Sequence, residues 1–125
     1  MRNGRKILDM HMHVFDKIDG KSVGGKTVGL KDGKIRTGNI ESQFMPANYH
    51  DTSFPVDACN RIMDSSGVDK ALLIQNPTIG NKNDYISESV KQYPDRFLDL
   101  FRWICMTRMP QNRWQHMQRT HWSKY

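Results

Sequence analysis

The order of secondary structure is decided by residues 54–97, which read FPVDACNRIMDSSGVDKALLIQNPTIGNKNDYISESVKQYPDRF. Pro55 suits the first turn of a helix, and Gly67 suits the cap that ends it. The apolar residues that recur between them at helical spacing are Ala58, Cys59, Ile62 and Met63. The segment VDKALLIQ, residues 68–75, has an uninterrupted apolar centre, which predicts a strand buried on both faces.

The remaining segments continue an alternation of strands and helices. Asn83 or Asp84 suits the start of a second helix that ends at Pro94, and residues 96–101, RFLDLF, are expected to form a further strand. Near the start of the chain, residues 6–14 form another expected strand. Alternating elements of this kind predict an α/β fold with parallel βαβ units.

A polar insert separates the first strand from residue 54. Within it, Asp32 and Gly33 fit a two-residue hairpin turn, so residues 28–36 are expected to form a hairpin. Residues 37–53 are expected to be a connecting loop.

The charge of the chain is unevenly distributed. The 125 residues carry a net charge of +6 and are 37% hydrophobic, which suits one small domain with a modest core. Residues 1–99 hold 14 basic and 13 acidic residues, whereas residues 100–125 hold five basic residues, no acidic residue and all three tryptophans. We found no signal peptide or bilayer-spanning run, so a cytoplasmic location is expected.

The stretch ILDMHMHVF, residues 7–15, contains a candidate metal-binding pair. On a regular strand, Leu8, Met10, Met12 and Val14 would point to one face, and Ile7, Asp9, His11 and His13 to the other. The Cα atoms of His11 and His13 would lie ~7 Å apart, so both imidazoles could bind one divalent ion. No catalytic residue and no further cofactor ligand is assigned from the sequence. The two cysteines, Cys59 and Cys105, form no disulfide framework or zinc pair and are expected to be buried thiols.

These motifs together resemble the amidohydrolase-related family of metal-dependent hydrolases and decarboxylases. ILDMHMHVF is similar to the D-x-H-x-H opening of the amidohydrolase superfamily. The later runs GVDKA, NDY and YPDRF occur in the order and spacing typical of the amidohydrolase-related branch, so the resemblance covers residues 6–99. It implies a (β/α)8 barrel with a mononuclear divalent metal, often zinc, and it implies that His11 and His13 are metal ligands.

The resemblance covers only part of such a barrel. A full barrel takes about 250 residues, so this chain would supply the first three βα units, with a hairpin insert after the first strand. The family's other ligands, two histidines and an aspartate, come from strands that the chain lacks. His50 lies in the polar insert, and His116 and His121 lie in the basic tail. An N-terminal fragment that is inactive alone is therefore expected.

The basic tail has a second interpretation at the level of its codons. In a shifted reading frame, the codons for residues 102–110 permit Val-Asp-Leu-(His/Tyr)-Asp-Pro-(Asn/Asp)-Ala, which resembles the family sequence after the third strand. We therefore divide the chain into residues 1–101, an amidohydrolase-related part, and residues 102–125, a frameshifted tail. The downstream coding sequence tests this division.

Two functional classes follow. The first is the N-terminal part of an enzyme that hydrolyses or decarboxylates a small carboxylated or cyclic substrate. Its partner would be that substrate, with no membrane and no nucleic acid, and the open sheet edge could allow self-association. The alternative is a small basic protein that binds nucleic acid through its Arg- and Trp-rich tail.

Overall fold

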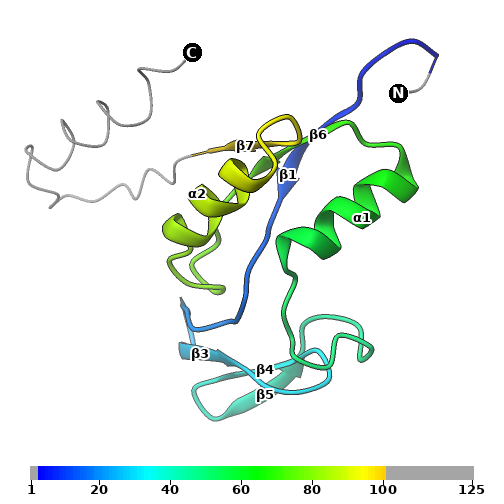
Figure 1. Cartoon of the computed structure of the whole chain (residues 1–125). Helices are drawn as coiled ribbons and strands as arrows, with labels where there is room; N and C mark the ends of the chain where they lie inside the picture. Colours follow the sequence, from blue (N-terminus) through cyan, green and yellow to red (C-terminus); the bar gives the residue numbers. More distant parts are fainter. Residues whose placement is uncertain (1–2, 101–125) are drawn as a thin grey trace, which may run out of the picture.

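The computed structural model describes residues 3–100, which form a mixed α/β structure around two sheets (Figure 1). The first sheet is parallel, has the strand order β1-β6-β7, and consists of β1 (Leu8–Met12), β6 (Lys70–Leu73) and β7 (Phe97–Asp99). The predicted α/β class and parallel pairing are confirmed. Residues 101–125, and with them the proposed division at residue 102, lie outside the described residues.

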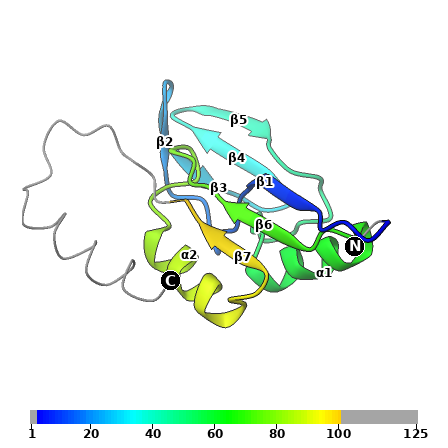
Figure 2. The ribbon, with the colours of Figure 1, turned by 90° about the horizontal axis from the view of Figure 1, so that it is seen from above.

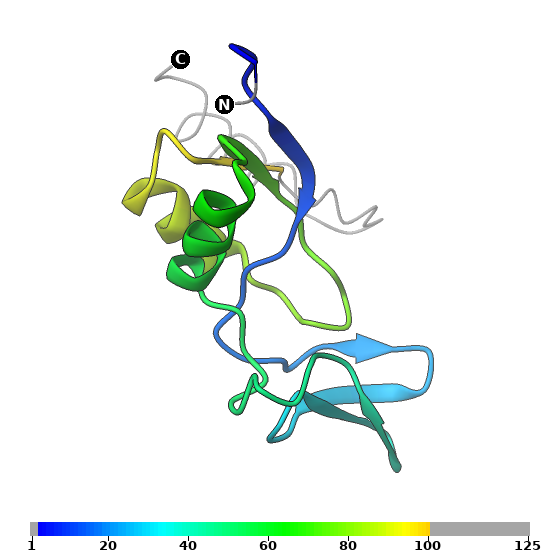
Figure 3. The ribbon, with the colours of Figure 1, turned by 90° about the vertical axis from the view of Figure 1, so that its right-hand side faces the viewer.

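Both helices, α1 (Val56–Ser66) and α2 (Asn83–Gln92), lie on the same face of the parallel sheet (Figures 2 and 3). The core between these helices and the sheet consists of Val14, Val56, Cys59, Met63, Ala71, Leu73, Ile86 and Phe97. The prediction that the second strand is buried on both faces is wrong. Ala71 and Leu73 are fully buried, but Lys70 and Leu72 are only half-buried. Within residues 3–100, helices cover one face of this sheet only.

The helix ends follow the sequence signals to within a residue. Pro55 precedes α1 as its N-cap, and Gly67 ends it in the left-handed conformation with φ +72°. Ile62, one of the apolar residues at helical spacing, is 40% exposed, because the buried face of α1 is formed by Val56, Cys59 and Met63. Lys82, rather than Asn83 or Asp84, is the N-cap of α2, and its side chain makes no capping bond.

The insert is a sheet of four strands rather than a hairpin and a loop. Its antiparallel order is β2-β3-β4-β5, with bounds Lys21–Ser22, Gly25–Gly29, Lys34–Thr37 and Ile40–Gln43. The predicted turn is confirmed, with φ +56° at Asp32 and +74° at Gly33. The prediction of a loop over residues 37–53 is wrong for Ile40–Gln43, which form β5. Every residue of β5 is exposed, and its sequence therefore shows no alternation of apolar and polar residues. The two-residue turn Gly38-Asn39 is the only sequence signal for this strand.

The insert sheet lies beyond the carboxyl end of β1 (Figures 1 and 3). It is anchored by reciprocal backbone hydrogen bonds between Phe15 and Phe54, at 2.9 and 3.0 Å. A second apolar cluster of Phe15, Ile18, Ile35 and Ile79 packs at this junction. Neither helix within residues 3–100 has the length and apolar character needed to cross a bilayer.

Candidate metal centre

The backbone of β1 contains an irregularity at the histidine pair. Asp9 pairs with Ala71 and Met12 with Leu73, so three steps along β1 match two steps along β6. One extra residue exchanges the faces of the side chains that follow it. The expected alternation of β1 is therefore wrong: Leu8 and Met10 are 45% and 59% exposed, whereas Met12 packs against the core and Val14 is buried in it. Asp9 also departs from its predicted place, because its register sets it beside the buried Ala71 on the helix-facing side.

The two imidazoles nevertheless converge. The Nε2 atoms of His11 and His13 are 3.1 Å apart, and the rings meet edge to face with centroids 4.9 Å apart. The Nδ1 atom of His13 lies 2.7 Å from the carbonyl oxygen of Ile74, which directly follows β6. A carbonyl oxygen can only accept, so Nδ1 of His13 must carry the proton. In the neutral ring, Nε2 of His13 then presents a lone pair.

This arrangement fits a divalent metal. With Zn–N distances of 2.0–2.1 Å, two nitrogens 3.1 Å apart subtend an angle of about 100° at the ion, between the tetrahedral and octahedral values. The bond from His13 to Ile74 is the support that metal-binding histidines usually have, because it fixes the tautomer and the ring orientation. The pair could therefore supply two ligands of a metal site.

A third ligand is not present in the described part of the chain. Within residues 3–100, no group of three or more His, Cys, Asp or Glu side chains is placed to hold a metal ion. Asp9, the nearest carboxylate in sequence, accepts a hydrogen bond of 2.9 Å from the backbone N–H of His11. Catalytic zinc sites normally have three protein ligands, so the pair supplies only part of such a site. Cys105, expected to be a buried thiol, and the tail residues His116 and His121 lie outside the described residues.

His50 and Cys59 have other surroundings. The Nδ1 atom of His50 is 2.9 Å from a carboxylate oxygen of Asp32, and both side chains are exposed on the insert. Cys59 lies on the buried face of α1 and is fully buried, as expected. Burial, and secondly the negative charge of Asp9, raise the pKa of the Cys59 thiol to about 11, although the charge of Arg96 opposes them. A thiol with this pKa stays protonated near neutral pH, whereas metals bind the thiolate.

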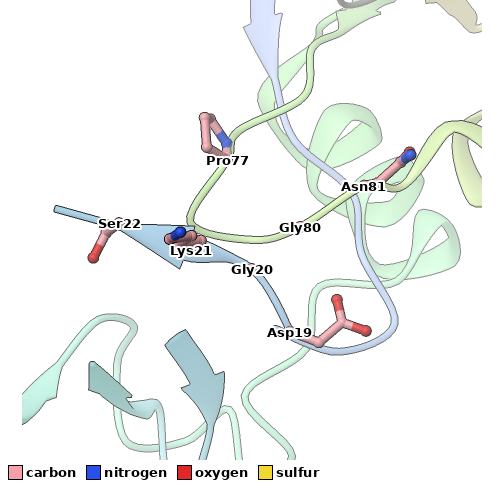
Figure 4. Close-up of a pocket in the computed structure, with 7 residues that line it drawn as sticks. All are labelled: Asp19, Gly20, Lys21, Ser22, Pro77, Gly80 and Asn81. Carbon is pink, nitrogen blue, oxygen red and sulfur yellow. The ribbon is translucent and has the colours of Figure 1, made fainter. Parts of the chain in front are cut away.

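The structure brings together one set of charged residues that the sequence did not single out. The ammonium group of Lys82, only 7% exposed, contacts carboxylate oxygens of Asp16 at 3.1 Å and Asp19 at 3.0 Å. The segments that carry these residues, the loop after β1 and the loop after β6, also line an open pocket of about 500 Å³ (Figure 4). No local pattern in the sequence links these residues, since 63 positions separate Lys82 from Asp19.

Comparison with known proteins indicates the fold. No family model matches the chain, and no curated protein matches it. A solved structure described as a probable 2-pyrone-4,6-dicarboxylic acid hydrolase from Acinetobacter baumannii, with citric acid bound, is similar with a TM-score of 0.53 and 19% sequence identity. The similarity covers 92% of this chain and 34% of that one, so the chain spans about a third of its length. At this identity, the likeness is one of fold.

Proposed function

We propose that the chain represents the first three βα units of a metal-dependent barrel enzyme of the amidohydrolase-related family, in which His11 and His13 bind a divalent metal. The observation that carries this proposal is the convergence of the two Nε2 atoms at 3.1 Å, with His13 oriented by the carbonyl oxygen of Ile74. Zinc is the first candidate, because imidazole nitrogens suit it and the spacing matches its bond lengths.

The position of the pair within the fold supports the same proposal. His11 lies in β1 and His13 directly after it, at the carboxyl end of a parallel strand. Parallel α/β folds place their reacting groups at this end of the sheet. The similar solved structure is described as a hydrolase of a cyclic dicarboxylic acid and holds citric acid, so a small carboxylated substrate is the class that we propose here.

The reaction would be a hydrolysis or a non-oxidative decarboxylation. When bound, the metal would supply Lewis-acid polarisation and a lowered pKa for bound water. This chain would hold two imidazole nitrogens at a fixed spacing. It would also keep the Nδ1–H group of His13 hydrogen-bonded to the carbonyl oxygen of Ile74. Two ligands fall short of a catalytic set, so we expect the 125-residue chain to show no metal-dependent turnover alone.

Metal binding by the purified chain tests the proposal. Titration with Zn²⁺, monitored by calorimetry, should show one site, and the visible spectrum with Co²⁺ should indicate imidazole nitrogen ligands. His11→Ala and His13→Ala should each weaken the affinity by at least about 10-fold. His50→Ala is the matched control, since His50 is an exposed histidine that lies with Asp32 on the insert.

The outcomes separate clearly. Equal affinity of the wild-type chain and the His11→Ala, His13→Ala double variant would refute the metal site. Turnover of an ester, lactone or carboxylated aromatic compound by the metal-loaded chain would contradict the expected inactivity and leave the metal site in place.

A further inference from the structure

Lys82 connects the two loops that follow β1 and β6. It precedes α2, its side chain is 7% exposed, and its ammonium group contacts both Asp16 and Asp19 in the loop after β1. Gly80 makes this approach possible. A Cβ atom at Gly80 would lie 2.5 Å from the same Asp19 oxygen that contacts Lys82, and its φ of +113° also favours glycine.

Two carboxylates and two ammonium groups form ion pairs in this cluster. The carboxylates are 51% and 42% exposed, and the Lys17 ammonium group lies 3.7 Å from the second oxygen of Asp19. Burial would raise the pKa of Asp16, but the hydrogen bond and the charge of Lys82, with the backbone N–H of Lys17, outweigh it and lower the pKa. Both aspartates face a nearly buried cation, so the contact has a defined geometry rather than that of a mobile surface pair.

Lys82 is also hydrogen-bonded to the segment that carries Ile74. The backbone N–H of Lys82 donates to the side-chain oxygen of Gln75, at 3.1 Å. Gln75 follows Ile74, whose carbonyl oxygen accepts the Nδ1 proton of His13. Asp16 is three positions beyond His13. Lys82 therefore contacts both chain segments that meet in the hydrogen bond between His13 and Ile74.

The β ladder reaches the residues of that hydrogen bond and ends there. Its last backbone bond in this region, from the N–H of Ile74 to the carbonyl oxygen of Met12, precedes His13. The two loops next share a backbone bond only at Asp19 and Ile79, at 3.1 Å. Between these two points, the ionic contacts of Lys82 and the apolar packing of the second cluster hold the loops together.

We propose that Lys82 is a positioning residue for the histidine pair. It holds the loop after β1 against the loop after β6. The Nδ1–H of His13 therefore keeps its hydrogen bond to the carbonyl oxygen of Ile74, and Nε2 keeps a lone pair. The metal-binding consequence rests on the proposed function. The effect on the His13 tautomer does not, because it concerns the metal-free protein.

Lys82→Met is the test variant, because it keeps the unbranched side chain as far as Cε and removes only the charged ammonium group. Asp16 and Asp19 are about half exposed, so water can solvate them in the variant. Lys91→Met is the matched control. It removes another lysine next to a carboxylate, at 2.7 Å from Glu88, but on the exposed side of α2. Far-UV circular dichroism verifies that both variants fold.

The first readout is the tautomer of His13, from nitrogen chemical shifts of its ring at about pH 8, above the ordinary imidazole pKa. We expect the Nδ1–H tautomer in the wild-type chain and in Lys91→Met, and a shift towards Nε2–H in Lys82→Met. The second readout is Zn²⁺ affinity, which should fall by about 10- to 100-fold in Lys82→Met only.

Two results would overturn the inference: an unchanged His13 tautomer in folded Lys82→Met, or equal Zn²⁺ affinity in Lys82→Met and Lys91→Met when the wild-type chain binds. If the wild-type chain binds no metal, the proposed function fails, and the tautomer still decides the role of Lys82. If Lys82→Met does not fold, Asp16→Asn replaces it. That variant leaves Asp19 to pair with Lys82 and should shift the tautomer in the same direction, to a smaller extent. The absence of any shift would overturn the inference.

Discussion

Gly20→Ala should separate the insert from the loop after β6. A Cβ atom at Gly20 would lie 2.1 Å from the carbonyl oxygen of Pro77 and 2.3 Å from that of Thr78. Both are backbone atoms, so no side-chain rotation relieves the overlap. The two segments must therefore move apart by at least about 1.3 Å to reach ordinary van der Waals distances.

The cost follows from the hydrogen bonds at this contact. The N–H of Lys21 donates to the carbonyl oxygen of Pro77 at 2.8 Å, and that of Asp19 donates to Ile79 at 3.1 Å. Each such bond contributes about 0.5–1.5 kcal/mol, so losing both costs about 1–3 kcal/mol. The smaller backbone entropy of the unfolded alanine variant offsets about 0.4–1 kcal/mol of this. We expect the free energy of unfolding to fall by about 1–2 kcal/mol.

Urea unfolding monitored by far-UV circular dichroism measures this change. Gly29→Ala is the matched control in the same insert. The nearest atom to its added Cβ would be Cβ of Ile18 at 3.5 Å, an ordinary contact, so its stability should not fall. Amide exchange at Lys21 should accelerate in Gly20→Ala only.

The reasoning would be refuted if Gly20→Ala matched Gly29→Ala in stability and kept the amide of Lys21 protected. That result would mean that the loop after β6 adapts without losing its contacts to the insert.

Three further predictions concern other parts of the molecule. Cys59 should not react with a thiol reagent at about pH 8 until the chain unfolds, because a pKa of about 11 leaves only about 0.1% thiolate; rapid native labelling would contradict this. The lowered pKa of Asp16 stabilises the fold above about pH 4, and this contribution is lost as the pH falls through the folded-state pKa. Asp16→Asn should therefore lower the free energy of unfolding above about pH 4 by about 0.5 kcal/mol or less. Urea titrations from about pH 2 to 6 measure the difference. We also propose self-association through the open sheet edge. Leu98→Lys should reduce it, because Leu98 is 40% exposed on the edge strand β7. Sedimentation that shows a wild-type monomer at all concentrations would count against that proposal.

Much of the fold could be predicted because its signals are local. Gly67 ends α1 in a left-handed conformation, and the Asp32-Gly33 turn sets both φ angles positive, so each element boundary depends on residues next to it. β5 was missed for the same reason. Its pairing with β4 comes from the sheet, whereas its own side chains show no apolar alternation.

The candidate site divides in the same way. The sequence by itself determined that two histidines would lie together near the end of the first strand, because residues two apart on an extended chain are always neighbours. Only the tertiary structure decided how they face each other. The irregular pairing of β1 with β6 set the faces of Asp9 and Met10, and the end of β6 supplied the carbonyl oxygen of Ile74 that orients His13.

The contact of Lys82 with Asp16 and Asp19 belongs wholly to the tertiary structure. Nothing near Lys82 in the sequence distinguishes it from a solvated surface lysine. It is nearly buried because parallel pairing of β1 and β6 brings the loops after both strands to the same end of the sheet, where two carboxylates from one loop meet one ammonium group from the other. Local signals fix where strands and helices begin and end, whereas long-range pairing decides which charges and ring nitrogens meet.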